Sequence, residues 1–306
     1  MILVIKEQLF PLYNMDKNYF LLVENTLNQQ EHKVQTRIFL VGCPRSGTTL
    51  LQSLLAAHPE IASFPESHFC NAIFINRTPK RQKLRLASKL AYTKLERFLR
   101  EISQEEMKQY LPKFGLFPSQ YAYSFIKILD ILTEQQDKSI WLEKTPGHIR
   151  YINYLEKLVK EVKFIHIIRN GADVVASLFE VSNQNPKFWS GGWDIDKCIQ
   201  QWIEDVRLTQ SHLFKFNHTL VEYEKLIENP RAILTEVCEF IRVEFVENML
   251  QDYQVVAKQV SLPNEPWKAS VRGKINSSNS KKFYKLFNQE QQTYILKRLS
   301  EVEVKI

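Results

Sequence analysis

The sequence predicts an α/β fold in which one central parallel sheet lies between layers of helices, as a three-layer sandwich. Short apolar runs recur along the chain, and each leads through a polar or glycine-containing loop into a segment with helical periodicity. Repeated strand-then-helix order is typical of parallel strands that are buried on both faces. Because we see neither an internal repeat nor a domain-boundary linker, we expect one domain over residues 37–306, preceded by an extension over residues 1–36.

The first strand of the domain is predicted at Ile38–Val41, and a loop with two glycines follows it. Gly42 and Gly47 break the apolar pattern, and from Thr48 leucines recur at helical spacing until about His58. A strand, a tight loop and a helix N-terminus gather backbone N–H groups and the positive end of the helix dipole around an anion. The alternative is an ordinary strand–turn–helix with an incidental glycine.

A short second strand is predicted at Ile61–Phe64, and Glu66 follows it at the sheet edge where such folds bind ligands. Residues 78–137 are then basic and helical, and we interpret them as a helical insertion beside the cleft. Their charges form either a solvated face or a patch that binds an acceptor.

Three more strands are predicted, each ending at a polar segment. They are expected at Ser139–Glu143, Lys163–Ile168 and His218–Tyr223. Longer helices are predicted at about residues 194–214, 231–241 and 281–299, and a single helix is expected in the extension at about 18–28. The tail over residues 255–280 lacks periodicity and is expected to be a loop.

Composition limits the classes of function. The 306 residues carry a formal charge of +7, with 44% hydrophobic and 25% charged residues, which suits a soluble protein that binds anions. A nucleic-acid partner would give the same charge bias, but the basic residues are spread along the chain and form no nucleic-acid motif, so we expect no such partner.

Cysteine spacing and hydropathy give an expectation about the compartment. Cys43, Cys70, Cys198 and Cys238 are widely separated and form no CxxC pair, which favours reduced thiols over disulfides or a zinc site. No apolar run approaches the length of a membrane span. We therefore expect a cytoplasmic protein without a membrane span; the sequence contains no indication of its oligomeric state.

The loop from Gly42 to Thr49 has the glycine spacing of a Walker A motif, with four residues between Gly42 and Gly47, but it lacks the lysine of that motif. Arg45, inside the loop, supplies the cation instead. This arrangement resembles the 5′-phosphosulfate loop of the sulfotransferase superfamily. That superfamily has a fold like that of P-loop nucleoside triphosphate hydrolases and uses 3′-phosphoadenylyl sulfate (PAPS) as cosubstrate. The resemblance implies that the 5′-phosphosulfate is held, without a metal, by Arg45, Ser46, Gly47, Thr48 and Thr49.

A second segment resembles the 3′-phosphate motif of the same superfamily. Arg169 ends a predicted strand, and Ser177 follows eight residues later on the next helix. The resemblance implies that both bind the 3′-phosphate of PAPS and of its product, adenosine 3′,5′-bisphosphate. The alternative is a capping arginine followed by an ordinary helix serine. Val181 stands where the tyrosylprotein branch has a further arginine.

Two later segments resemble nucleotide contacts of the tyrosylprotein branch more loosely. Tyr223 corresponds to a tyrosine that contacts the nucleotide, although it is equally typical of an aromatic packed at a strand end. The basic run Arg272, Gly273 and Lys274 lies where the family closes a loop over the adenine and the 3′-phosphate.

The catalytic groups follow from the same resemblance. Cytosolic sulfotransferases have a histidine two residues after a lysine, but here Lys144 is followed by threonine and proline. Glu66 resembles the catalytic glutamate of the tyrosylprotein and carbohydrate sulfotransferases, so this branch is the closer one. We expect Glu66 as general base, and Lys144 and Arg45 as groups that stabilise the transition state. His68 and His148 are competing bases.

The predicted function is transfer of a sulfuryl group from PAPS to a hydroxyl, or to an amine, of a small-molecule, glycan or peptide acceptor. Trp189, Trp193 and Trp202 could line the acceptor pocket, or they could be core aromatics. One alternative function is a P-loop phosphotransferase or NTPase, which would depend on magnesium and ATP. Another is a non-catalytic nucleotide-binding module.

Overall fold

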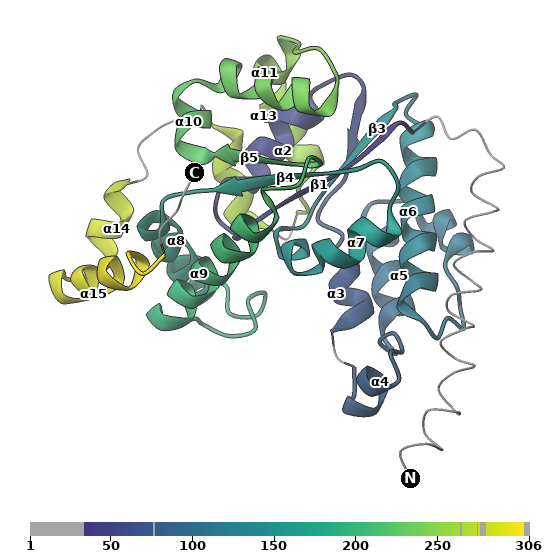
Figure 1. Ribbon diagram of the computed structural model, residues 1–306, viewed down its shortest axis with the longest axis horizontal. Helices are drawn as coiled ribbons and strands as arrows, with labels where there is room; N and C mark the ends of the chain where they lie inside the picture. The colour runs from purple at the N-terminus through teal and green to yellow at the C-terminus, as the bar shows by residue number, and fades with distance from the viewer. Residues whose placement is uncertain (1–33, 76, 264, 274, 276–279, 303–306) are drawn as a thin grey trace.

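The structure is a computed structural model that describes residues 34–75, 77–263, 265–273, 275 and 280–302 (Figure 1). The helix expected at residues 18–28 and the predicted site residue Lys274 lie outside the described residues. Within the described part, the chain forms a parallel sheet of five strands with helices on both faces. The predicted α/β architecture is therefore confirmed.

The strands lie in the order β2-β3-β1-β4-β5, so the first strand of the chain occupies the centre of the sheet. Their bounds are β1 (Thr36–Gly42), β2 (Ile61–Ser63), β3 (Ile140–Lys144), β4 (Val162–Ile168) and β5 (His218–Glu222). All five were predicted from apolar runs, with bounds that differ by one or two residues. These runs are recognisable because parallel strands in such a sheet are buried on both faces.

Alternation along β1 divides the core into two layers. Ile38 and Leu40 point to one face of the sheet, whereas Phe39 and Val41 point to the other. The first face is covered by α2 (Thr48–Ala56), α10 (Tyr223–Glu228), α11 (Pro230–Ile241), α12 (Asn248–Gln251) and α13 (Tyr253–Gln259). The second face is covered by α3 (Phe69–Phe74), α5 (Ala91–Glu101), α6 (Pro118–Glu134) and α7 (Ile152–Leu158).

A third group of helices packs around its own apolar cluster beside the end of β4. It consists of α8 (Gly171–Gln184), α9 (Ile195–His212), α14 (Ser280–Leu286) and α15 (Gln289–Leu299). Side chains fix where these helices begin: Asn170 accepts hydrogen bonds from the first turn of α8, and Asp194 does the same for α9. Figure 1 shows α14 and α15 beside α8 and α9, although they come from the end of the chain.

The C-terminal part departs from the prediction. The single helix expected at residues 281–299 is two helices, because Asn288 and Gln291 form a capping box that starts α15 anew. The tail expected to be a loop contains most of α13 and a 3₁₀ helix, η3 (Pro266–Arg272). Both elements are only seven residues long, too short to give a recognisable periodicity.

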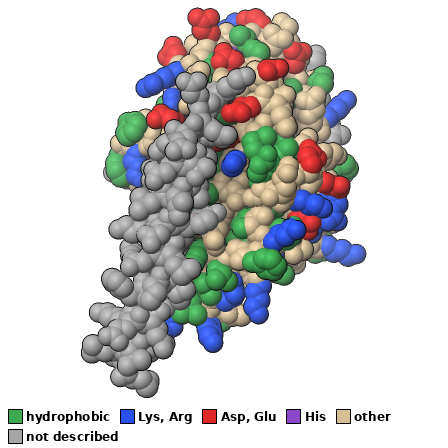
Figure 2. Space-filling model, turned by 90° about the vertical axis from the view of Figure 1, so that its right-hand side faces the viewer, with side chains coloured by type: hydrophobic (Ala, Val, Ile, Leu, Met, Phe, Trp, Pro, Cys, Tyr) green, Lys and Arg blue, Asp and Glu red, His purple; other side chains and the backbone are tan. Residues whose placement is uncertain are grey.

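The segment over residues 78–137 is helical, as predicted. Besides α5 and α6 it holds α4 (Pro79–Lys83) and the 3₁₀ helix η1 (Glu105–Tyr110). Lys80 and Lys83 are on α4, and Lys80 is exposed. Figure 2 shows the side of the molecule on which these helices lie, where Lys and Arg side chains are mixed with acidic and hydrophobic ones.

None of the helices within the described residues has both the length and the apolar composition that a bilayer crossing requires. Cys43, Cys70, Cys198 and Cys238 are all free thiols and all buried.

Candidate active site

The strand order brings three predicted segments together at the C-terminal ends of the strands, which we call the carboxyl edge of the sheet. In the central strand β1, Leu40 lies opposite Lys144 of β3, and Gly42 lies opposite Ile167 of β4. The loop after β1 therefore emerges between the ends of β3 and β4. Since parallel strands end at the same edge, Lys144 and Arg169 flank this loop from its two sides.

The backbone of the loop requires its second glycine. Gly47 has a φ of 92°, and a Cβ at this position would lie 2.3 Å from Cδ2 of Tyr223. Only glycine fits this left-handed and crowded position. Gly47 also precedes α2 without a side-chain cap, so the N–H groups of the first turn are left for another partner. Arg45 is left-handed as well, with a φ of 74°.

Arg45 joins the two predicted phosphate motifs. Its Nε donates to Oγ of Ser177 at 3.0 Å, and its carbonyl oxygen accepts from Nη1 of Arg169 at 3.3 Å. Burial and the nearby Arg169 guanidinium lower the pKa of Arg45. Two partly or fully buried guanidinium groups at close range repel each other, and an anion between them would remove this repulsion.

Arg169 is held in place from several sides. It is 8% exposed, its guanidinium lies 4.5 Å from the centre of the Tyr223 ring, and its Nη2 lies 3.4 Å from Oδ2 of Asp173. Its Nε is buried without a hydrogen-bond partner among the described residues, and so is Oγ of Ser46. Buried polar atoms without partners are uncommon, and here they fit a ligand with anionic oxygens.

Glu66 lies on the β3 side of the loop, after β2. Its Oε1 accepts a short hydrogen bond from Nζ of Lys144 and lies 2.8 Å from Nζ of Lys268, while its Oε2 lies 3.4 Å from Nε2 of His68. Burial by itself raises the pKa of Glu66, but these three neighbours outweigh it and hold that pKa well below its usual range. Glu66 is therefore ionised at neutral pH.

Lys144 is fully buried between Glu66 and the loop. Its Nζ also donates to Oγ1 of Thr49 at 3.2 Å, so the ammonium group lies beside the first turn of α2. Burial lowers the pKa of Lys144 to about 8, even though Glu66 raises it. Lys144 is thus mostly charged at neutral pH and loses its charge just above it.

A second buried carboxylate, Glu143, supports this arrangement from behind. It accepts hydrogen bonds from Oγ of Ser67 at 2.7 Å, from Oγ1 of Thr145 at 2.7 Å and from Nδ1 of His148 at 2.8 Å. These bonds tie the chain next to Glu66 to the chain next to Lys144. His148 is fully buried in this network, whereas His68 lines the open cavity. Of the two competing bases, only His68 faces the position of a ligand.

The site opens into a cavity of about 660 Å³. The predicted residues that line it are Arg45, Gly47, Thr48, Thr49, Glu66, Arg169, Ser177, Tyr223 and Gly273. Arg272 belongs to η3, but its side chain lies outside the described part. Trp189 lines the cavity, whereas Trp202 is buried in the core beneath it. Residues 78–137 contribute none of the described lining of this cavity.

Sequence reasoning missed one wall of the cavity. Glu265, Trp267 and Lys268 of the tail line it. Chemistry was predicted in the tail only for Arg272, Gly273 and Lys274, because residues 265–268 show no periodicity and resemble no motif. The one available signal is an aromatic and two opposite charges within four residues of an irregular segment, where functional residues are over-represented.

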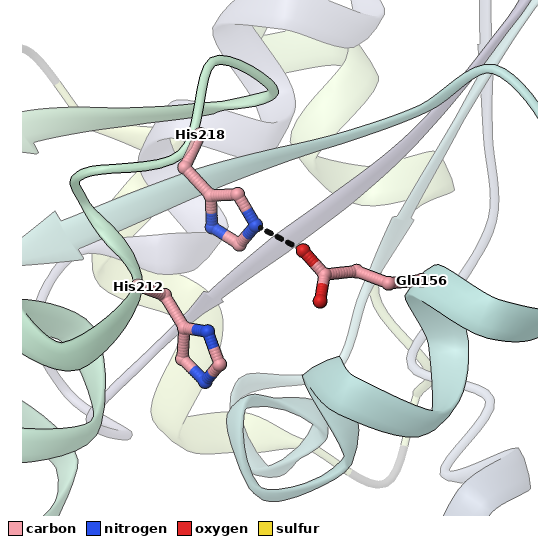
Figure 3. Close-up of side chains that lie close together, drawn as sticks. All are labelled: Glu156, His212 and His218. Atoms are coloured by element: carbon pink, nitrogen blue, oxygen red, sulfur yellow. Dashed lines mark hydrogen bonds and ion pairs between the residues drawn. The ribbon is translucent and has the colours of Figure 1, made fainter.

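A different cluster lies at the opposite edge of the sheet and has residue types that bind metals. Glu156, His212 and His218 place one potential ligand atom each within 4.8 Å of the others (Figure 3). However, the ammonium group of Lys215 lies 2.7 Å from Oε2 of Glu156 and 3.0 Å from Nδ1 of His212. Lys215 therefore already supplies a cation to this cluster, and a metal ion would have to displace it.

Comparison with known proteins adds a family match. The sequence model described as the sulfotransferase family matches residues 37–247, which is well over half of the chain. The matched range begins in β1 and includes the glycine loop, Glu66, Lys144, Arg169, Ser177 and Tyr223.

Similar sequences carry names from one branch of that family. Protein-tyrosine sulfotransferase A of Caenorhabditis elegans is 24% identical over 234 residues, which cover 74% of this chain and 55% of that protein. Protein-tyrosine sulfotransferase 2 of Gallus gallus is 22% identical over 241 residues, covering 76% and 58%. The chain thus spans little more than half the length of these curated relatives.

Two solved sulfotransferase domains have a fold similar to that of this chain. The sulfotransferase domain from the curacin biosynthetic pathway has a TM-score of 0.59 at 22% identity, covering 87% of this chain and 98% of that one. The sulfotransferase domain from the Synechococcus PCC 7002 olefin synthase has a TM-score of 0.57 at 24% identity, covering 89% and 97%. These two likenesses concern the fold.

Proposed function

The chain belongs to the sulfotransferase family, in the branch of its protein-tyrosine sulfotransferase relatives, and from this premise we propose that it transfers a sulfuryl group from PAPS to a hydroxyl group. The observation that carries the proposal is the contact of Arg45 with both Ser177 and Arg169. This contact joins the two segments that resemble the 5′-phosphosulfate and 3′-phosphate motifs at one cavity. A donor with an anionic group at each end fits such a pair of sites.

The residues of the site divide into two groups in this proposal. The loop residues 45–49 and the N-terminus of α2 would hold the 5′-phosphosulfate, and Arg169, Ser177 and Tyr223 would hold the nucleotide end. When bound, the donor supplies a sulfuryl group, whose bond to the 5′-phosphate oxygen breaks as the acceptor oxygen takes it up, leaving adenosine 3′,5′-bisphosphate. Neutralisation by protein cations makes a metal ion unnecessary.

Glu66 and Lys144 would carry the proton and charge chemistry. The acceptor hydroxyl must lose its proton, and the ionised Glu66 carboxylate at the cavity wall is placed to receive it. Lys144 lies between Glu66 and the first turn of α2, where its charge would stabilise the oxygen that leaves the sulfur. Arg45 would add a second positive charge from the loop side.

The acceptor class we favour is a phenol, either a peptide tyrosine or a small aromatic molecule. The cavity wall beyond the loop is aromatic, with Phe188 and Trp267 rings 5.3 Å apart and Trp189 within 6.4 Å of Trp267. Aromatic side chains such as these stack favourably against an aromatic ring of an acceptor. The names of the relatives agree with this choice, and a glycan acceptor is the alternative.

The first test is calorimetric titration with adenosine 3′,5′-bisphosphate, followed by transfer from radiolabelled PAPS to a panel of phenols, tyrosine peptides and glycans. We expect tight binding without added metal, and transfer that persists in EDTA. Binding of ATP with magnesium but not of the bisphosphate would favour a phosphotransferase instead. Binding without transfer to any acceptor, together with a silent Glu66→Gln substitution, would indicate a non-catalytic module.

A further inference from the structure

A segment from the C-terminal part, here called the strap, lines the site. We define it as residues 265–268, which include the start of η3. Oε2 of Glu265 accepts a hydrogen bond from the N–H of Leu262 at 2.9 Å, which fixes the entry of the strap. The carbonyl oxygen of Trp267 accepts from Nη2 of Arg45 at 3.3 Å, which fastens the strap to the glycine loop.

The strap places the Lys268 side chain inside the site. Lys268 is 5% exposed, and its Nζ lies 2.8 Å from Oε1 of Glu66 and 2.6 Å from Oε1 of Glu265. Both contacts are close ion pairs, although neither has the angles of a hydrogen bond. A buried ammonium group is costly unless it is paired, so its position indicates a specific interaction with the two carboxylates.

Lys268 shares a single oxygen of Glu66 with Lys144. Both ammonium groups approach Oε1, one from the strap and the other from β3. The other charged or titratable groups near Glu66 are His68, from its own loop at Oε2, Arg45, from the glycine loop, and Glu265, whose Oε1 contacts the same ammonium group of Lys268. With Oε1 fixed by two cations, Oε2 is the oxygen left to receive a proton.

We propose that Lys268 is a positioning residue for Glu66, which it holds ionised and oriented with Oε2 toward the cavity. This proposal rests on the proposed function only for its catalytic consequence. The electrostatic effect of Lys268 on Glu66 is a property of the protein without any ligand. It can therefore be measured whether or not the enzyme transfers sulfuryl groups.

The expected effect follows from the sign of the charge. Lys268 stabilises the ionised form of Glu66, so its removal raises the pKa of that carboxyl, by about 1–3 pH units for an opposite charge at this distance. At acidic pH a larger fraction of Glu66 is then protonated, and the base is lost. At alkaline pH the carboxylate is still ionised and is a stronger base, so the rate is retained better there.

The direct test is a carbon-13 NMR titration of the Glu66 carboxyl in the ligand-free protein, assigned with Glu66→Gln. In the Lys268→Met variant we expect the midpoint to rise by about one pH unit or more, while Lys268→Arg restores the wild-type value. Lys258→Met, an exposed lysine on α13, serves as the matched control and should leave the midpoint unchanged. An unchanged Glu66 midpoint in folded Lys268→Met overturns the proposal.

The second test is the pH dependence of kcat/KM for the same variants. For Lys268→Met we expect the acidic limb to move up by the same amount as the NMR midpoint. On that limb the rate relative to wild type should fall about tenfold for each pH unit by which the midpoint rises. A uniform loss of rate at every pH would indicate a merely structural role for Lys268 and contradict the proposal. Absence of transfer in wild type together with a raised NMR midpoint in Lys268→Met would reject the proposed function and leave the effect on Glu66 standing.

Discussion

Two clusters with nearly the same residue types lie at opposite edges of the sheet. At the carboxyl edge, Glu66 contacts Lys144 and His68. At the amino edge, where the strands begin, Glu156 contacts Lys215 and also His218, the second contact being drawn in Figure 3. In both clusters burial raises the pKa of the glutamate, and the neighbouring cations or hydrogen bonds lower it overall. Judged by residue types alone, the two clusters are equivalent.

The surroundings of Glu66 and Glu156 distinguish the two clusters. Glu66 shares one cavity with the glycine loop, the N-terminus of α2 and Arg169, whose buried Nε has no partner among the described residues. Around Glu156 the imidazoles satisfy one another instead: His218 is bonded to His166 at 2.8 Å, and His166 to Thr209 at 3.2 Å. Ionisable residues therefore indicate a reaction site only when the neighbouring backbone has free N–H groups that can bind the ligand.

The largest expected effect separates the two glutamates directly. Glu66→Gln removes the base and should lower turnover by about 10²- to 10⁴-fold, with unchanged binding of adenosine 3′,5′-bisphosphate. Glu156→Gln is the matched control and should keep turnover within about twofold of wild type, since it lies at the other edge of the sheet. Transfer assays and calorimetry on both variants measure this. Near-normal turnover of Glu66→Gln would move the role of base to His68.

Substitution of Arg169 at the carboxyl edge should give the next largest effect. Arg169→Ala removes charge-assisted hydrogen bonds to the nucleotide, so binding of adenosine 3′,5′-bisphosphate should weaken by about 10- to 100-fold. Arg231→Ala, on the exposed surface of α11, should leave the dissociation constant unchanged. An equal, small effect of both substitutions would mean that the 3′-phosphate is bound elsewhere.

A smaller effect distinguishes Lys144 from an ordinary lysine. The proposed mechanism needs its charged form, and its pKa of about 8 means that this form is lost as the pH rises through that value. The kcat/KM for the donor should therefore fall by up to about tenfold between pH 8 and pH 9. A profile that stays flat to pH 10 would show that the charge of Lys144 is not needed.

Substitutions at the amino edge should change the free energy of unfolding rather than the rate of transfer. Burial lowers the pKa of His166 to about 3, whereas an unfolded chain has a histidine pKa near 6.5. The folded state thus binds fewer protons than the unfolded state between these values, and the free energy of unfolding falls as the pH drops below about 6.5. Urea titrations should show that His166→Phe lowers this dependence by about 1.4 kcal/mol per pH unit. An unchanged slope would mean that His166 is protonated in the folded protein.

The smallest expected effect concerns metal. Because Lys215 already bridges Glu156 and His212, added Zn²⁺ or EDTA should move the melting temperature by less than about 1 °C. Lys215→Met, which removes the internal cation, is the variant in which zinc binding would first be detected. Stabilisation of the wild type by zinc would show that the cluster of Glu156, His212 and His218 binds a metal ion.

The parts of the molecule that sequence could predict are those whose cause is local. The strands are continuous apolar runs, and the glycine loop needs its special residues within a few positions of each other, so both were recognisable. Lys268 acquires its role only through a contact with Glu66, about 200 residues earlier in the chain, and nothing in the neighbouring sequence encodes that contact. Glu143 was similarly hidden, since a strand residue beside Lys144 is recognised as a structural support only once its three donors are known.

The central position of β1 has a consequence for how such a scaffold diversifies. Groups for the transferring end of the proposed donor come from β2 and β3 on one side of β1, and groups for the nucleotide end come from β4 and β5 on the other. The two sides meet at the loop after β1, where Arg45 contacts both Ser177 and Arg169. Substitutions near β2 and β3 that keep Arg45 in place can therefore alter the transferring end while the residues of the nucleotide end stay the same.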